Sequence, residues 1–280
     1  MQHVEFFHRD HFEFRYHRKK AKKSLSRFID FFWETDFDDL YLQYPEGFSD
    51  ALFPNVGYTY LINLGTPFVM QLEEECFEMR ADGFLPRHRN MICHHSAGNR
   101  IFGIKFRVSP VVFQKKINFF EYRDFIFPLA YLIDPDVVEK VKSAGSFERR
   151  IEILSNHYDR IVEKHADSLN YVKIVTEILD TCAARDGFHE TIETLAGRYN
   201  VSSRTLQRYF EAATSISTKQ ALQIMRIRKA VEHLASDPAT FHYSNYGYYD
   251  HSHFYKHLKG FINHHQIGIM EPHLKLLKGE

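Results

Sequence analysis

The feature that most constrains this chain is a pattern of helix, tight turn and helix that occurs twice in its last third. In the first copy, residues 191–210, apolar residues recur at the spacing of one helical face. Asn200 suits the turn, because asparagine tolerates the positive φ that ends a helix. Ser202 can cap the next helix by accepting a hydrogen bond from a free backbone N–H. The apolar face of the first helix consists of Ile192, Leu195, Ala196 and Tyr199.

The second helix of this copy divides into an apolar and a polar side. We expect Leu206, Tyr209, Phe210 and Ala213 to face inward, which leaves Ser203, Arg204, Gln207, Arg208 and Glu211 on the outer side. A helix with an exposed polar edge after a tight turn can enter a DNA major groove. Arginine and glutamine also suit bidentate contacts with guanine and adenine edges. Taken alone, the segment leaves open an ordinary helical hairpin with a solvated outer side.

The downstream sequence repeats the scheme. A helix is expected over 219–234 and ends at Asp237-Pro238, and a second short helix is expected to end at Gly247. Asp250 can then cap a last helix, whose inner side holds Phe254, Leu258 and Phe261 and whose outer side holds His251, Ser252, Tyr255, Lys256 and Lys259. Ser203 and His251 correspond and lie 48 residues apart. The connecting helix, about 19 residues over 217–235, spans ~28 Å, whereas successive major grooves lie ~34 Å apart. The sequence therefore predicts two DNA-reading helices spaced for neighbouring grooves.

Residues 188–260 resemble the AraC-type transcription regulators. The resemblance rests on three blocks in order: LA with VSSRTLQRYF, then RIRKA followed by L, then GYYDHSHFYKHLK. The chain departs from the family pattern at His242-Tyr243, at Ser215, where a glycine is common, and in the tail after Gly260. The matching positions are Ser202, Arg204, Leu206, Arg208, Phe210, Arg226, Ala230, Leu234, Gly247, Tyr248, Asp250, Ser252, His253 and Phe254.

The preceding part of the chain predicts strands and then helices. From about residue 26 to 109, short apolar runs are separated by turn residues, which favours a small β-barrel or sandwich. Phe102, Ile104, Phe106 and Val108 alternate with polar or small residues, as in a half-buried strand. Helices are expected after Ser109-Pro110, after Ser146 and over 172–182. The expected fold is thus multidomain α and β: a β-rich domain over 1–125, a helical linker or dimerisation segment over 126–187, and an all-α domain with two helix-turn-helix units joined by a long helix over 188–280.

The β-rich part is similar, more loosely, to the small cupin-like sensor domains of an AraC subgroup. The similarity rests on Phe53-Pro54-Asn55, on the run from Ile62 to Phe68, and on Gly103-Ile104-Lys105-Phe106. It implies a domain that binds a ligand or a partner, and it does not identify the effector.

Charge and cysteine content fit this interpretation. The chain has 36 Lys and Arg against 36 Asp and Glu, but residues 188–280 carry 11 basic and 8 acidic residues, a net +3. This mild asymmetry permits DNA binding without demonstrating it. Three widely spaced cysteines fit reduced thiols. No apolar run approaches the ~20 residues of a membrane span, and the charged N-terminus does not fit a signal peptide, so we expect a cytoplasmic protein without a membrane partner.

The main alternative is a small-molecule or metal-dependent cupin-like enzyme with a helical accessory module. His88, His94 and His95 are the nearest metal-ligand candidates, but adjacent strand residues point to opposite faces, so His94 and His95 do not share a site on a regular strand. His251 and His253, two apart on a helix, do not share a face either. We expect no metal, no cofactor and no catalysis. The basic run 15–27 is interpreted as a solvated surface, with a DNA-phosphate contact as its alternative.

The sequence hypothesis is therefore a transcription regulator that binds double-stranded DNA. Ser203, Arg204 and Gln207 would read bases from the first helix, and His251, Ser252 and Tyr255 from the second. Arg208, Lys256 and Lys259 would hold phosphates, which fix register without carrying sequence information. Further expected partners are a small-molecule effector, a second copy of the chain and the transcription machinery.

Overall fold

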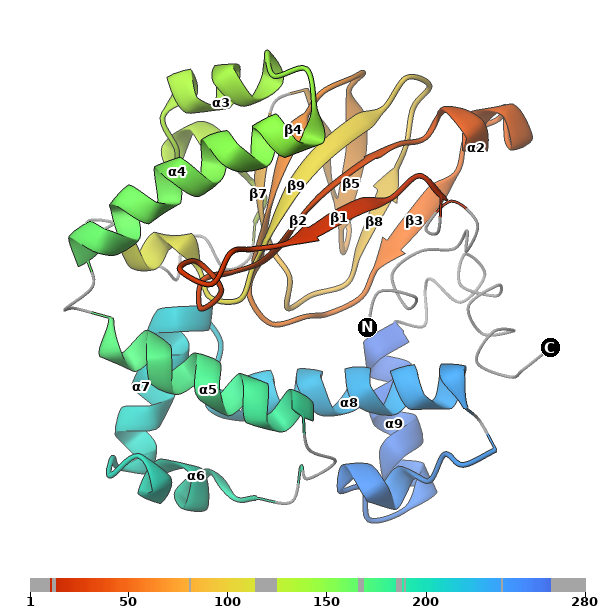
Figure 1. The fold of residues 1–280 in the computed structure, drawn as a ribbon. Coiled ribbons are helices and arrows are strands. Elements are labelled where there is room, and N and C mark those ends of the chain that lie inside the picture. Colours follow the sequence, from red (N-terminus) through yellow and green to blue (C-terminus); the bar gives the residue numbers. More distant parts are fainter. Residues whose placement is uncertain are drawn as a thin grey trace.

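The N-terminal part of the computed structural model is built from two antiparallel sheets (Figure 1). The structure describes residues 11, 14–80, 82–113, 125–165, 169–184, 188, 190–237 and 239–262. One sheet has the strand order β1-β2-β9-β4-β7-β10, and the other has the order β3-β8-β5-β6. The strands are β1 (His17–Lys20), β2 (Ile29–Asp36), β3 (Ser49–Leu52), β4 (Tyr58–Asn63), β5 (Phe68–Leu72), β6 (Glu75–Met79), β7 (Gly83–Pro86), β8 (Met91–His94), β9 (Arg100–Phe106) and β10 (Phe127–Pro128). The predicted β-rich N-terminal domain is confirmed, with the sheets open at their edge strands.

Strand β9 lies at the centre of the larger sheet, between β2 and β4, and is buried on both faces. Phe102, Ile104 and Phe106 are fully buried, as their alternation predicted. The opposite face is also covered: a Cβ at Gly103 would lie 2.1 Å from the Trp33 ring, and Lys105 is only 6% exposed. The expectation of a half-buried strand is therefore wrong, because neighbouring residues of the fold also cover the face that the polar alternation assigned to solvent.

Two helices cover the other face of the larger sheet, α3 (Pro135–Lys142) and α4 (Phe147–His165) (Figure 1). Ser146 caps α4 by accepting a hydrogen bond from the N–H of Arg149 at 3.2 Å, as predicted. The α4 residue Tyr158 packs edge-on against Phe106, with 5.5 Å between the ring centroids. The shorter elements of this part are α2 (Asp38–Gln43) and the 3-10 turns η1 (Pro110–Phe113) and η3 (Leu129–Tyr131).

A buried ion pair ties α4 to the sheet. Arg150 and Glu34 are both nearly inaccessible, and the guanidinium lies 3.0 Å from the Glu34 carboxylate. Arg100, on the neighbouring strand, donates to the same carboxylate at 2.7 Å. Two hydrogen-bonded cations offset the cost of burying this carboxylate, and removing either partner would leave charge unpaired. The position of α4 on β2 is thereby fixed.

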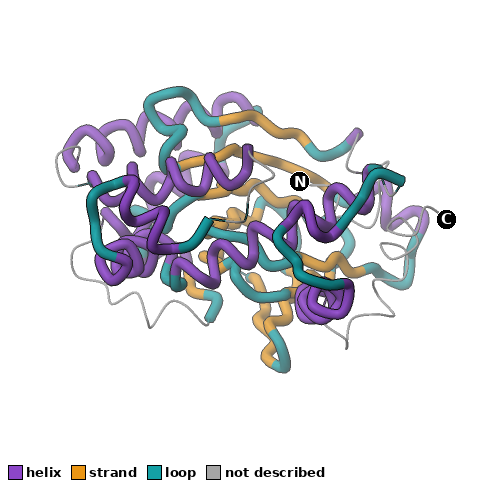
Figure 2. The backbone as a smooth tube through the Cα atoms, turned by 90° about the horizontal axis from the view of Figure 1, so that it is seen from below, coloured by secondary structure: helices purple, strands orange, loops and turns teal. Residues whose placement is uncertain are grey.

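The rest of the described chain is helical and lies below the sheets (Figures 1 and 2). It consists of α5 (Asn170–Ala184), α6 (Ile192–Arg198), α7 (Ser203–Thr214), α8 (Thr218–Ser236), the 3-10 turn η5 (Tyr243–Tyr246) and α9 (His251–Ile262). Helix α5 packs against α7 and α8. The expected junction at 185–187 and the tail after 262 lie outside the described residues. In the described part of the chain, no helix combines the length and the apolar character needed to cross a membrane.

Candidate nucleic-acid interface

The first helix-turn-helix unit forms from local capping signals. Thr191 accepts a hydrogen bond from the N–H of Thr194 at 3.2 Å and starts α6. Asn200 has a φ of 53° in the turn, and Ser202 accepts from the N–H of Thr205 at 3.1 Å to start α7. Each cap satisfies a donor that would otherwise lack a partner in the first helical turn. The predicted turn and cap are confirmed.

Helix α7 buries one side and exposes the other, as its sequence predicted. Leu206, Phe210 and Ala213 are fully buried, and the ring of half-buried Tyr209 lies 5.9 Å from that of Tyr171 on α5. On the outer side Arg204, Gln207 and Arg208 are exposed, whereas Ser203 and Glu211 are half-buried. The Gln207 amide donates to the Glu211 carboxylate at 2.9 Å.

Helix α8 connects the two units. It has 19 residues, and Ser217 caps it by accepting from the N–H of Gln220 at 3.2 Å. At 1.5 Å per residue its length is ~28 Å. Its packing side is fully or nearly buried and consists of Ala221, Ile224, Ile227, Ala230 and Val231. The predicted length of the connector is confirmed.

The second unit starts differently from the first. The predicted short helix is a single 3-10 turn, η5, which ends at Gly247 with a φ of 72°. The His242 side chain accepts from the N–H of Ser244 and caps this turn. The Tyr246 hydroxyl, 2.7 Å from Nδ1 of His233, holds the turn against α8. Asp250 then caps α9 by accepting from the N–H of His253 at 2.7 Å, as predicted.

The outer side of α9 presents the five polar residues that the sequence analysis singled out. All five are exposed, and together with Gly260 they line one shallow hollow of about 480 Å³: His251, Ser252, Tyr255, Lys256 and Lys259. The His251 ring stacks on that of Tyr255 at 5.9 Å, and the Lys259 ammonium lies 4.8 Å from the centroid of the same ring. The helix thus presents aromatic, hydroxyl and cationic groups on one surface.

The inner side of α9 is apolar. Phe254 and Phe261 are buried, and Leu258 is half-buried. On this side burial lowers the pKa of His257, and the nearby His253 lowers it further. The lowered pKa favours the neutral form of His257, which suits its packing on this side of the helix.

The two outer helices have the same orientation relative to the sheets. The carbonyl of Ala213, at the end of α7, accepts from the N–H of Ser109 at 2.6 Å. At the end of α9 the Phe261 ring stacks on Phe53 of the sheet domain, with 5.2 Å between centroids. Both helices therefore touch the sheet domain with their C-terminal ends, and both begin on the far side of the molecule, at opposite ends of α8 (Figure 1). The N-terminal end of a recognition helix is the part that contacts bases.

Tyr249 is a surface group that the sequence analysis missed. It is 92% exposed just before α9, whereas its neighbour Tyr248 is 2% exposed and packs on Phe254. The tyrosine pair was visible in the sequence, but only the fold distinguishes the buried ring from the free one. An exposed tyrosine beside the start of such a helix offers a hydroxyl donor to a phosphate.

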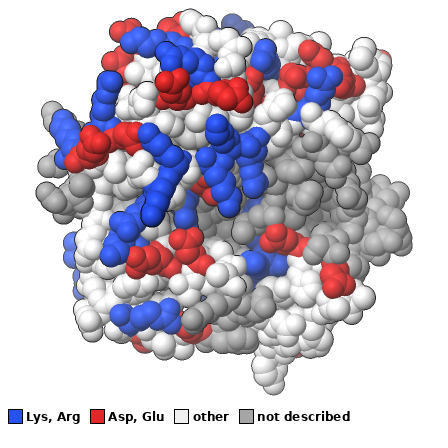
Figure 3. All heavy atoms as spheres, in the orientation of Figure 1, with Lys and Arg blue, Asp and Glu red and all other residues white. Residues whose placement is uncertain are grey.

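A second missed feature is a cationic region between the sheets and the helices. Lys and Arg side chains gather across the middle of the face shown in Figure 3. Arg228 of α8 is 3% exposed and donates to the carbonyl of Pro54 at 2.9 Å. Arg228 lines a cavity between the sheets and the helices, and Arg18 and Lys20, from the basic run 15–27, line it as well. Residues 17–20 of that run form the edge strand β1, which no local pattern connected to α8.

The histidines of the sheet domain lie in different surroundings. His94 is hydrogen-bonded to Ser49 and Gln71 at 2.7 and 3.2 Å. His95 contacts Asp50 and Asn99 at 3.1 and 2.7 Å instead. Among the described residues no group of three or more His, Cys, Asp or Glu is arranged to hold a metal ion.

Comparison with known proteins gives one family match. The model of a helix-turn-helix domain family matches residues 195–264, and no curated protein sequence matches the chain. Among solved structures, ToxT from Vibrio cholerae at 1.65 Å resolution is 10% identical, covers 88% of this chain and 94% of its own, and has a TM-score of 0.42. An apo variant of ToxT is 10% identical with 88% and 96% coverage and a TM-score of 0.46. ToxT bound to an unsaturated fatty acid is 12% identical with 84% and 94% coverage and a TM-score of 0.44.

The family match extends from the first unit, through the connector, to the second outer helix. It includes Leu195 of α6, all of α7 and α8, and α9 as far as it is described. The capped outer helices, their 19-residue connector and this match place residues 195–264 of the chain in the AraC-type helix-turn-helix family.

Proposed function

We propose that this chain is a sequence-specific DNA-binding transcription regulator that places α7 and α9 in adjacent major grooves of one duplex. The observation that carries the proposal is the arrangement of the two capped helices at opposite ends of α8, with both N-terminal ends turned away from the sheets. A connector of ~28 Å, together with the width of the flanking helices, fits the ~34 Å between successive grooves. The proposed location of the protein is the cytoplasm.

The polar side chains on the outer sides of α7 and α9 have proposed roles in DNA binding. Ser203, Arg204 and Gln207 of α7 read base edges in one groove. Their counterparts on α9 are His251, Ser252 and Tyr255. Arg and Gln supply bidentate contacts to guanine and adenine. The phosphate contacts are assigned to Arg208, Lys256 and Lys259, which lie farther along the two helices.

Selection of bound duplexes from a random pool tests the proposal. The selected sites are expected to hold two blocks of preferred bases, centred about 10 base pairs apart. Affinity is expected to fall steeply with salt, because phosphate contacts release counterions. A folded protein that ignores duplexes of every sequence at low ionic strength contradicts the proposal, and so does a single short block.

Arg204→Ala is the sharpest substitution within this proposal. Arg204 is exposed near the start of α7, so its loss leaves the fold intact. It is expected to cost ~1–3 kcal/mol of DNA affinity and to relax preference at one base pair. Arg149→Ala, on the exposed side of α4, is the matched control and is expected to leave DNA affinity unchanged. Unchanged affinity and preference in Arg204→Ala would show that this residue does not read DNA.

Three further partners belong to the proposal: a small-molecule effector, a second copy of the chain and the transcription machinery. The chain is divided into residues 1–125, 126–187 and 188–280. In this proposal the first part senses an effector, and the middle part pairs two copies of the chain. Sedimentation velocity over a range of protein concentrations tests the pairing. A constant monomer mass at all concentrations, with and without operator DNA, would remove it. Recruitment of the transcription machinery is the expected consequence of operator binding.

A further inference from the structure

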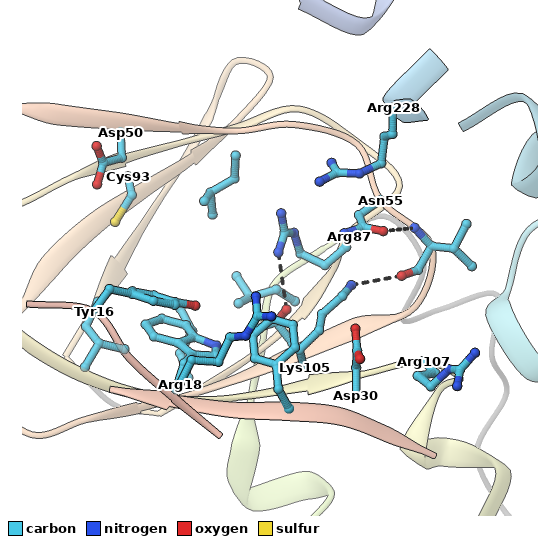
Figure 4. A pocket seen from close by; sticks show the side chains of 18 of the residues that line it. Tyr16, Arg18, Asp30, Asp50, Asn55, Arg87, Cys93, Lys105, Arg107 and Arg228 are labelled. Carbon is cyan, nitrogen blue, oxygen red and sulfur yellow. Dashed lines mark hydrogen bonds between the residues drawn. The ribbon is translucent and has the colours of Figure 1, made fainter. Parts of the chain in front are cut away.

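A cavity of about 480 Å³ lies between the sheets and the DNA-binding helices (Figure 4). Its walls come from strands of both sheets and from α5 and α8. The volume falls in the range of small-molecule sites. The two ends of the cavity differ in chemistry, and each end favours a different functional group on a bound ligand.

One end is cationic. Arg87, Lys105 and Arg228 are 5, 6 and 3% exposed, and Figure 4 shows them converging from different elements. Lys105 donates to the carbonyl of Val56 at 2.8 Å, and Arg228 donates to that of Pro54 at 2.9 Å. The whole lining holds seven Lys and Arg side chains against three Asp. Cations concentrated in a poorly solvated space create a positive potential that favours an anion.

The body of the cavity is apolar. Trp33, Leu61, Met70 and Leu85 contribute to its wall, and the last three are at most 5% exposed. Apolar surface that an occupant covers here adds affinity in proportion to its area. The occupant therefore needs an apolar body as well as its anionic group.

The opposite end is polar and holds Asp50, beside Cys93 (Figure 4). Asp50 is 3% exposed, and its Oδ2 accepts from Nε2 of His95 at 3.1 Å. Nδ1 of His95 lies 2.7 Å from Oδ1 of Asn99, whose amide nitrogen donates to the carbonyl of Thr66. Both ring nitrogens of His95 therefore face acceptors, which an imidazolium satisfies by donating from both.

The charge state of His95 agrees with this geometry. Burial by itself would lower the pKa of His95, but the adjacent Cys93 sulfur and the hydrogen bond to Asp50 outweigh it and raise the pKa to about 10. His95 is thus an imidazolium at neutral pH, and it donates to the Asp50 side chain. Oδ1, the other oxygen of Asp50, has no hydrogen-bond partner within the described part of the chain. A buried carboxylate oxygen at a cavity wall is a strong acceptor for a donor group brought by a ligand.

We propose that the cavity binds a small molecule with two polar ends: an anionic group at Arg87, Lys105 and Arg228, an apolar body, and a hydroxyl or amine that donates to Asp50. A plain alkyl carboxylate can place its anionic group at the cationic end of the cavity. Its hydrocarbon tail then lies against the Asp50 carboxylate at the opposite end. The Asp50 oxygen then loses water and gains no partner, which weakens binding. Asp50 is therefore the residue that sets the chemical class of the ligand.

Any effect of the ligand on DNA binding rests on the regulator function proposed above. Arg228 belongs to α8, the helix that spaces α7 and α9. The ligand itself is tested without DNA, so that failure of this inference and failure of DNA recognition are separate results.

Fluorescence of Trp33 reports on the cavity directly, because this side chain lines it and is the only tryptophan in the sequence. The full-length protein is titrated with three probes of equal chain length: ω-hydroxydodecanoate, dodecanoate and dodecane-α,ω-diol. The hydroxy acid is expected to bind about tenfold more tightly than either of the others, since one hydrogen bond to a charged group is worth at least that factor. Equal binding of the hydroxy acid and the plain acid overturns the role of Asp50. A diol that binds as tightly as the hydroxy acid overturns the anionic end, and no binding by any probe overturns the site.

Asp50→Asn isolates the polar end. The variant is expected to lose the tenfold preference for the hydroxy acid while its affinity for dodecanoate stays within about twofold. Asp38→Asn, an exposed position on α2, is the matched control and keeps the preference. A preference that survives in Asp50→Asn refutes the assignment. If Asp50→Asn does not fold, the three-probe comparison on the unaltered protein decides alone.

Discussion

Ser215, at the end of α7, is predicted to weaken the DNA-binding domain, and Ser215→Gly is predicted to strengthen it. Ser215 caps the helix in the left-handed region, with a φ of 59° and a ψ of 8°, and its N–H donates to the Glu211 carbonyl at 2.9 Å. It is 5% exposed, and its hydroxyl has no hydrogen-bond partner among the described residues. Glycine adopts this conformation without strain and brings no hydroxyl.

The magnitude follows from three contributions. A left-handed conformation costs a residue with a Cβ about 1–2 kcal/mol. Relieving this strain with glycine is offset by about 0.5–1 kcal/mol, because glycine has more conformational freedom in the unfolded chain. A buried hydroxyl without a partner costs at least about 1 kcal/mol. Ser215→Gly should therefore raise the free energy of unfolding by about 1–2 kcal/mol.

Urea unfolding followed by far-UV circular dichroism measures this change, and hydrogen exchange of the α7 amides locates it. Ser215→Ala removes the hydroxyl and keeps the Cβ, so it should gain about 1 kcal/mol, less than glycine. Asn200→Gly is the matched control: Asn200 also has a positive φ, of 53°, but is exposed, and asparagine tolerates this region. A Ser215→Gly variant that is less stable than the unaltered protein, or no more stable than Ser215→Ala, refutes the reasoning.

Three further predictions concern caps, packing and pH. Ser202→Ala removes the acceptor for the N–H of Thr205 and should cost about 1 kcal/mol of stability with DNA affinity reduced in parallel; a change below about 0.3 kcal/mol in urea unfolding contradicts the role of the cap. Leu206→Ala empties a fully buried site and should cost about 3–5 kcal/mol, and a thermal midpoint equal to that of the unaltered protein would show that α7 is not packed there. The raised pKa of His95, about 10 in the folded chain against ~6.5 unfolded, contributes stability that is fully present below pH ~6.5 and lost as pH rises through 10. Urea midpoints should therefore fall between pH 7 and pH 10, with a shallower fall in Asp50→Asn, and a midpoint that rises over this range contradicts the ion pair.

The sequence by itself determined the features that depend on neighbours within one or two helical turns. The caps at Ser146, Ser202 and Asp250 form from side-chain acceptors placed three residues before free backbone donors, and all three occur as predicted. The positive φ of Asn200 and the length of α8 follow from the same local signals. These signals were sufficient to predict α7 and α9 and the residues on their outer sides. The 3-10 turn η5 was the local exception, because the His242 cap and the bond between Tyr246 and α8 shorten the expected helix.

Only the tertiary structure decided which strand faces are buried and where the cations meet. Alternation in β9 correctly marked Phe102 as buried, but the other face of the strand is buried as well. The Trp33 ring of β2 covers Gly103, and Lys105 lines the cavity between the sheets and the helices, so no pattern within the strand reveals what covers this face. The cavity brings Lys105 together with Arg228, 123 residues later in the chain. Such convergence depends on strand order and on how α8 packs under the sheets, and these are set by long-range burial, which leaves no periodic signal at either residue.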